Sequence, residues 1–508
     1  MSAHSEPEKY SIDEMMERLK NRPSESPVEN GELVVRADGS QAIRVRKRKR
    51  RTQQPHKEEL RHKRRIRMIQ VSAVLILLLL AVLGAGIAIV YANSAPFREN
   101  LIRNISEATG ARVDLQQFRM NPTGANAGRM VLTWPDGGVL RELDLRGIKA
   151  QIAPKSFFGK SMTGEEALAT DGTLTLDSPD AGASSVPPAA TVGSSRVSFE
   201  TYVITKLQVV AGNPASPRLR LRDTEASFST NNAVDRPQLL LNRGEFSAPG
   251  WPKLRLDRSQ IEFRGQDIDI IGMRIRHESD SRGLFQLNGT ISPYATNSAS
   301  TLNVQLESFL MSGLTGPEFG KLLSGRIDSV SSPNSNTLSF TPGSGSDASL
   351  KVTFRSSLGA PFEIEGFPCL FGLSQILDDQ WFAHPTAEDD VTGTLHRNGD
   401  TLTISDFHFE NKARLILRGS LALTSGNKLS GNLQLGIAPG VMKAARTKRL
   451  DSLFGPPSEG YRWLTVTVGG TAAKPTDNFR ELFDSNATSQ SAAPSRNIPS
   501  FEDLTRPK

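Results

Sequence analysis

The sequence predicts a mainly β protein, in which a single N-terminal transmembrane helix precedes a long antiparallel β-sheet with a few short helices. Three observations predict this fold. One uncharged run extends from Met68 to Ala92. After it, apolar and polar residues alternate over short segments from Arg112 nearly to the end of the chain, as in half-buried strands. Gly, Asn and Asp separate these segments at the spacing of hairpin turns.

Residues 1–67 are predicted to be a disordered, basic cytoplasmic tail, because they are charged and poor in aromatic residues. Its basic charge is concentrated in residues 44–67, which hold 13 Lys or Arg against 2 Glu. From residue 68 onward the chain has 43 basic and 43 acidic residues, so the net charge of +7 is due to the tail. The main part is neutral, and we expect no nucleic-acid partner.

Residues 68–92 are predicted to span a membrane. At 1.5 Å per residue, 25 uncharged residues exceed the roughly 30 Å hydrocarbon core of a bilayer. The basic residues before the span place the N-terminus in the cytoplasm and the main domain outside. A single cysteine, Cys369, excludes an intramolecular disulfide and fits the bacterial periplasm. We therefore predict a single-pass protein of the bacterial inner membrane with a periplasmic main domain.

Three segments are predicted after the span. Residues 96–110 form an amphipathic helix, since Phe97, Leu101 and Ile105 share one face and Gly110 ends it. Residues 111–483 form the β-rich domain. Residues 484–508 form a disordered tail.

The clearest alternation lies in two passages, residues 254–276 and residues 401–437. In both, apolar side chains are expected on one face of antiparallel strands and polar ones on the other. The candidate apolar face comprises Leu254, Leu256, Ile261, Phe263, Ile268, Ile270, Leu402, Ile404, Leu415, Leu417, Leu421, Leu423, Leu433, Leu435 and Ile437. Helices are expected to interrupt the strands at 316–325, 370–379 and 440–455, and mobile loops at 179–196 and 331–349.

Motifs of known chemistry are missing from the sequence. The residues ahead of Gly320-Lys321 do not complete a phosphate-binding loop, and there is no GxSxG, HExxH or CxxC. The densest polar cluster comprises Asp378, Asp379, His384, Glu388, Asp389 and Asp390. These residue types can bind a divalent metal or act as acid and base, but an acidic loop after a helix is usually only solvated. We expect no catalytic residues, no metal and no cofactor, and no enzyme activity.

The layout of the chain resembles the AsmA-like family. The resemblance lies in a short tail, one span, a helix ending in TGARVDL, and the C-terminal segments GTLHRNGDTLTISDFHFENKARLILRGSLAL and YRWLTVTVGGTAAKPTDNF, with Gly470, Thr471, Lys474 and Pro475. The basic tail and modest length depart from the large members of that family.

This resemblance implies a bridge-like lipid-transfer protein. Its long antiparallel sheet would be curved into a groove and would carry phospholipid acyl chains on an apolar inner face, next to the inner membrane, in support of outer-membrane and envelope biogenesis. The alternative is a membrane-tethered periplasmic scaffold, with a closed β core, that organises envelope protein partners. Alternation cannot separate the two, because a groove and a closed core both bury alternate residues. A hydrolase that uses the cluster around His384 is a third hypothesis.

Overall fold

The computed structural model describes residues 32–35, 37–44, 54–121, 123–153, 162–177, 197–229, 236–293, 298–331, 335–341, 348–387, 391–412, 414–443, 445 and 449–490. The chain divides into two compact units, between Val82 and Leu83. Most of the predicted tails, the loop at 179–196 and the acidic residues 388–390 lie outside the described residues. The predicted loop at 331–349 is described in part, and there the prediction is wrong for Thr337–Phe340, which form a strand whose Leu338 and Phe340 pack against the core.

The first unit contains a hairpin and most of a long helix. Strands β1 (Glu32–Val35) and β2 (Gln41–Arg44) pair antiparallel around a turn, in which Asp38 Oδ1 accepts hydrogen bonds from the N–H and the hydroxyl of Ser40. Helix α2 (Gln54–Ala92) then begins well before the predicted span and ends where that span ends. Its segment Lys63–Ala92 is long and apolar enough to cross a membrane, by length and composition.

Helix α3 (Ala95–Thr109) opens the second unit and lies where the amphipathic pattern predicted it. Pro96 stands in its first turn, where a missing N–H costs nothing. Gly110 ends it in the left-handed conformation, with φ of 67°, and donates its N–H to the carbonyl of Ser106. Leu101 is buried on the side that faces the sheet.

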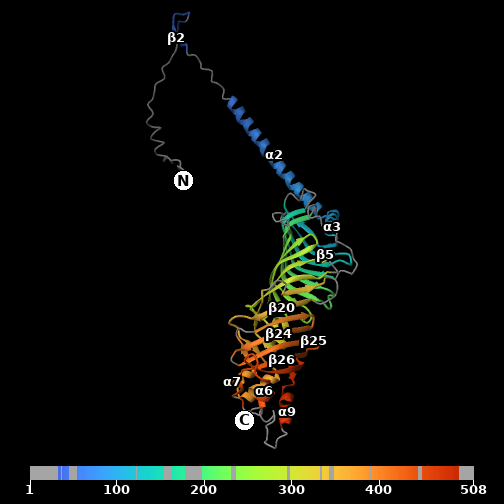
Figure 1. Cartoon of the computed structure of the whole chain (residues 1–508). Coiled ribbons are helices and arrows are strands. Elements are labelled where there is room, and N and C mark those ends of the chain that lie inside the picture. Colours follow the sequence, from blue (N-terminus) through green and yellow to red (C-terminus); the bar gives the residue numbers. More distant parts are fainter. Residues whose placement is uncertain are drawn as a thin grey trace. The chain divides into compact units, whose positions relative to one another are not determined.

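The rest of the unit is built on one large curved sheet, so the predicted mainly β class with few helices is confirmed. Successive strands are neighbours from β5, beside α3, to β26, near α6, α7 and α9 (Figure 1). Its first strands are β3 (Arg112–Gln116), β4 (Arg119–Asn121), β5 (Gly124–Thr133), β6 (Leu140–Gln151), β7 (Met162–Leu176), β8 (Val197–Ala211), β9 (Leu219–Ser229), β10 (Gln238–Asn242), β11 (Glu245–Ser247), β12 (Leu254–Arg264) and β13 (Asp267–His277).

The later strands of this sheet are β14 (Leu284–Ile291), β15 (Ser300–Glu307), β16 (Phe309–Leu310), β18 (Arg326–Ser329), β19 (Thr337–Phe340), β20 (Ser349–Ser356), β23 (Val391–Asn398), β24 (Thr401–Asn411), β25 (Leu415–Thr424), β26 (Lys428–Ile437), β27 (Arg462–Thr471) and β28 (Lys474–Asp477). A second sheet of three short strands consists of β17 (Leu323–Ser324), β21 (Phe362–Ile364) and β22 (Thr386–Ala387). Short gaps divide some strands of the large sheet; for example, β10 and β11 each pair with both β9 and β12.

One pair of strands departs from the antiparallel prediction. Strands β7 and β8 run parallel over their whole length, from Met162 beside Val197 to Leu176 beside Ala211. Local alternation carries no information on strand direction, because parallel and antiparallel partners bury the same alternate side chains. The neighbouring pairs β6–β7 and β8–β9 are antiparallel, as are β12–β13 and β23–β24.

A bend crosses the first strands of the sheet. Gln117 and Gly147 are left-handed, with φ of 54° and 62°, and the registers place both opposite Gly128. A Cβ on Gly128 would lie 2.3 Å from the side-chain oxygen of Gln117, so a larger residue there would displace the Gln117 side chain. A different alternate set of residues is buried on each side of this bend. Leu115, Met120 and Ala127 nevertheless belong to one cluster. The bend therefore keeps both halves of each strand facing the same side and curves the sheet.

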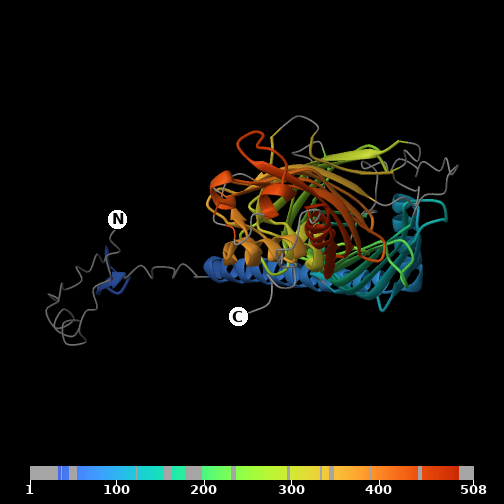
Figure 2. The ribbon, with the colours of Figure 1, turned by 60° about the horizontal axis from the view of Figure 1, so that its bottom comes forward.

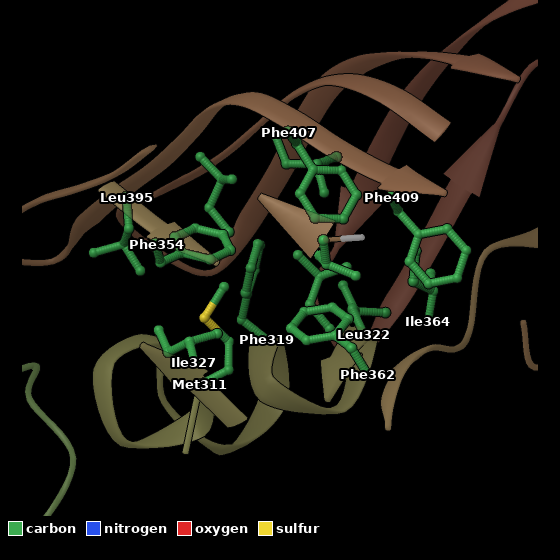
Figure 3. Packing of buried hydrophobic residues seen from close by; sticks show 14 of the residues in the cluster. Met311, Phe319, Leu322, Ile327, Phe354, Phe362, Ile364, Leu395, Phe407 and Phe409 are labelled. Atoms are coloured by element: carbon green, nitrogen blue, oxygen red, sulfur yellow. The ribbon is translucent and has the colours of Figure 1, made fainter. Parts of the chain in front are cut away.

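Short helices fill the space inside the C-terminal part of the sheet. They comprise α4 (Ser312–Thr315), α5 (Pro317–Leu322), α6 (Pro368–Leu377), the 3-10 helix η2 (Gln380–Ala383), α7 (Pro439–Met442), α8 (Arg449–Leu453) and α9 (Phe479–Gln490), so helices occur at all three predicted interruptions. Figure 3 shows Met311 and Phe319, from the helical segment, packed against Phe354 and Phe407 from the strands. Figure 2 shows these helices gathered at one end of the curled strands.

One buried ion pair supports this core. Asp280, 7% exposed, accepts two hydrogen bonds from the Arg326 guanidinium, at 2.8 and 2.9 Å, and two more from the N–H groups of Arg282 and Gly283. The paired guanidinium holds the pKa of the Asp280 carboxyl far below its usual range. The pair joins the turn after β13 to β18.

Candidate functional site

The apolar side of the sheet differs between its two parts. In the C-terminal part, the apolar side chains belong to one contiguous cluster and most are less than 4% exposed. In the N-terminal part, many side chains at equivalent positions are only half-buried. We call these the N-terminal face: Leu145, Ile148, Leu174, Tyr202, Ile204, Val209, Phe228, Leu239, Ile261, Phe263 and Ile268.

The predicted apolar residues are divided between the two environments. On β12 and β13, Leu254, Leu256 and Ile270 are buried, whereas Ile261, Phe263 and Ile268 are half-buried. The nine from β24, β25 and β26 all lie inside the packed cluster, with exposures from 0 to 8%: Leu402, Ile404, Leu415, Leu417, Leu421, Leu423, Leu433, Leu435 and Ile437.

The predicted hairpin of residues 254–276 is present. Ile261 lies opposite Ile270, and Phe263 lies opposite Ile268. One register shift adds Asp257 to β12 and a second adds Ile271 to β13, so each strand changes the phase of its apolar positions once. The hairpin therefore presents its apolar residues on one side throughout, as the pattern predicted.

Aromatic rings form a row across the N-terminal face. Tyr202 of β8 lies 5.8 Å from the ring of Phe199 and 6.2 Å from that of Phe228 on β9. Phe228 lies 5.9 Å from Phe263 on β12. Phe228 and Phe263 are half-buried and belong to neither of the packed clusters that adjoin the face. The row thus offers apolar ring surface that the described side chains only partly cover.

A second aromatic group connects this part of the sheet to the end of α2. Tyr91, 57% exposed, lies 5.9 Å from Phe97 of α3, which stacks on Phe118 at 6.4 Å. Phe97, Phe118, Tyr202 and Phe199 all pack in the same cluster. Apolar contact is therefore continuous from the last turns of α2 to the row of rings on the sheet.

Hydrogen bonds fix this junction. The side-chain amide of Asn93, just after α2, donates to the carbonyl of Met120 at 2.9 Å and accepts from its N–H at 2.7 Å. It thereby pairs with the edge of β4 as another strand would. The Trp134 indole donates to the carbonyl of Thr109 at 3.0 Å and ties the end of α3 to the sheet.

The polar groups of the face are few and mostly buried. The Tyr202 hydroxyl accepts the N–H of Phe199 at 3.2 Å, and burial raises the pKa of this phenol. Thr224 and Ser259 are fully buried beneath the apolar side chains. On the opposite side of the sheet, the Arg129 guanidinium is 2.8 Å from Asp144 and lowers the pKa of that carboxyl. Such a face can hold an apolar ligand, but it brings together no nucleophile and base among the described residues.

The polar cluster around His384 is arranged differently from the sequence prediction. Asp379 caps η2 through the N–H of Trp381 and forms an ion pair with Arg414 at 3.2 Å, and Asp378 ends α6. His384 instead lies beside Glu363 and Glu365. The i, i+2 spacing of the two glutamates indicates that they share one side of a strand. It does not indicate their contact with His384, because they lie about 20 residues away from it in the sequence.

Comparison of the chain with protein-family models, with curated proteins and with solved structures found no match. The likeness to the AsmA-like family therefore stays a prediction from the sequence pattern.

Proposed function

We propose that this chain is an AsmA-like, membrane-anchored periplasmic protein that holds phospholipid acyl chains on the N-terminal face and so supports outer-membrane and envelope biogenesis. The observation that carries the proposal is the half-buried apolar face, on which Phe228 and Phe263 belong to neither packed cluster. A folded protein ordinarily buries so much contiguous apolar surface in its own core, and where it does not, a ligand or partner covers the surface. Acyl chains match a surface of aliphatic and aromatic side chains with almost no free polar group.

The junction with α2 supports the same proposal. A lipid that leaves a bilayer along α2 would meet Tyr91, Phe97 and Phe118 before the sheet, and these rings contact one another. Aromatic side chains are common where a chain leaves a bilayer, because one ring can face both lipid and water. The apolar path would then spare the acyl chains exposure to water.

The scaffold hypothesis has support from a different part of the chain. The C-terminal part is a closed core, as an interaction module would have, and it offers Phe371, 56% exposed, and Leu358, 78% exposed, to a partner. The two hypotheses thus apply to different parts of the sheet. A protein that carries lipid near the membrane and contacts envelope proteins with its C-terminal part would satisfy both.

The lipid proposal predicts that the full chain, purified in mild detergent, carries phospholipid. Replacing Phe228 and Phe263 together by Asp is expected to reduce bound phospholipid about tenfold or more, since each ring contributes roughly 1.5–3 kcal/mol of apolar contact. Mass spectrometry of the extracted lipid measures the loss. Circular dichroism and protease resistance should show that the variant still folds, because both positions are half-buried.

Ser227→Asp is the matched control, since it adds a charge of the same sign to β9 on the opposite side of the strand. It is expected to retain the lipid. A wild-type protein without lipid, or an equal loss in the control, would contradict the proposal.

The proposed location in the inner membrane, with a periplasmic main domain, predicts an asymmetric pattern in reporter fusions. A reporter that is active only outside the cytoplasm should work when fused after Lys508 and fail when fused before Met1. The reason is the excess of Lys and Arg ahead of the span. The reverse pattern would place the face in the cytoplasm and remove the envelope role.

A further inference from the structure

We propose that Glu363, Glu365 and His384 form a binding site for a divalent transition metal of the zinc class. The site lies on the second, three-stranded sheet, away from the residues of the N-terminal face. The sequence does not predict this site, because the acidic residues that follow His384 in the chain are not the two glutamates that it contacts in the structure. The proposal goes beyond the proposed function and does not depend on it.

The fold places the two carboxylates on one side of β21. Phe362 and Ile364 are 0% and 1% exposed and point into the core, so Glu363 and Glu365, which alternate with them, project outward. The N–H of Glu365 donates to the carbonyl of Leu322 at 3.0 Å, which fixes the end of the strand. Both glutamates therefore stand on well-anchored backbone.

A buried neighbour also positions His384. It follows η2, whose Phe382 is 1% exposed and belongs to the core, and it precedes β22, where Thr386 lies opposite Glu363. The N–H of His384 donates to the carbonyl of Trp381 at 3.2 Å. Packing and strand pairing thus bring the imidazole to the two carboxylates.

The spacing of the donor atoms suits a tetrahedral metal. His384 Nδ1 is 3.1 Å from Glu365 Oε1 and 3.9 Å from Glu363 Oε1, and one donor atom from each residue lies within 4.8 Å of the others. Zinc bonds to nitrogen and oxygen of about 2.0–2.2 Å require ligand atoms roughly 3.3–3.6 Å apart. Shifts of about an ångström or less in exposed side chains would complete the geometry.

The electrostatics favour a cation in this position. Among the described residues, His384 is the only ion-pair partner of either glutamate. Both carboxylates approach the same nitrogen of His384, so a positive charge between them would relieve their mutual repulsion. The side chains are 38%, 42% and 58% exposed, which leaves room for water as a fourth ligand.

The test is zinc binding to the full chain in detergent, measured by calorimetry and by the visible absorption of Co²⁺ as a substitute. We expect one ion with a Kd on the order of micromolar, and a Kd weaker by about tenfold or more in His384→Ala and in Glu365→Gln. Zinc should also raise the Tm of the wild type and leave that of His384→Ala unchanged.

His408→Ala is the matched control. His408 Nε2 lies 3.3 Å from Glu410 Oε2, so it forms the same kind of pair with only one carboxylate. Its loss should leave zinc binding unchanged. If the wild type binds no zinc, or if His384→Ala binds it as tightly, the three residues form only an ion-pair cluster and the proposal is wrong.

Discussion

Replacing Leu417 by Asp is expected to unfold the C-terminal part of the sheet. Leu417 is 1% exposed within the packed cluster, opposite Phe409 on one side and Leu435 on the other. A carboxylate there would lose its water and find no cation, at a cost of several kcal/mol. Because domains are stable by only about 5–15 kcal/mol, this one change removes a large share of the total. Circular dichroism during urea unfolding measures the effect.

Two further variants test whether burial of the charge causes the loss of stability in Leu417→Asp. Ser420→Asp places the same charge on an exposed position of β25 and is expected to change the free energy of unfolding by less than about 0.5 kcal/mol. Ile268→Asp, on the half-buried N-terminal face, should cost less than Leu417→Asp and leave the protein folded. If Leu417→Asp and Leu435→Asp both remain folded and stable, the C-terminal part is open to water and belongs to the groove after all.

The similar patterns of the two passages explain why the sequence could not decide between groove and core. Residues 254–276 and 401–437 alternate in the same way, yet Phe263 is half-buried and Phe409 is fully buried. Phe409 belongs to the packed cluster that contains side chains of α4, α5 and α6, whereas Phe263 does not belong to that cluster. Strand alternation records that a face is apolar, but the residues that cover it lie elsewhere in the chain.

Whether the apolar residues fall on even or odd positions told more about the strands than the alternation itself. Leu402 and Ile404 occupy even positions, and Phe407 and Phe409 occupy odd ones, although all four are buried. The strand has a register shift between Ile404 and Phe407, where Asp406 adopts φ of 51°. A switch from even to odd apolar positions within one strand therefore indicates a bulge. The order of apolar and polar residues is enough to locate that bulge.

Contacts between distant segments could not be found in this way. The parallel pairing of β7 and β8 and the approach of His384 to Glu363 depend on how the chain returns to the sheet. The buried Arg397 is a third example. A charged residue in a strand is ordinarily expected on the exposed side, but Arg397 is 4% exposed.

Replacing Arg397 by Met is expected to destabilise the C-terminal part by about 3–5 kcal/mol. The guanidinium donates to the carbonyls of Leu314 at 2.6 Å and Gly399 at 3.2 Å, and also to that of Gly250. Methionine would preserve much of the apolar stem but leave these acceptors without their donor, and each unsatisfied buried group costs about 1–3 kcal/mol. Urea unfolding of both proteins measures the difference.

Arg414→Met is the matched control, because the two arginines make the same ring contact in different surroundings. The Arg397 guanidinium lies 4.8 Å from the Trp251 ring, and that of Arg414 lies 4.8 Å from the Trp381 ring. Arg414 is 40% exposed and pairs with Asp379, so its loss should cost under about 1 kcal/mol. Equal losses of stability in Arg397→Met and Arg414→Met would mean that the contact with tryptophan accounts for the effect. A much larger loss at Arg397 would show that one buried cation, through three carbonyls far apart in sequence, holds the turn before β12, the end of α4 and the β23–β24 hairpin together.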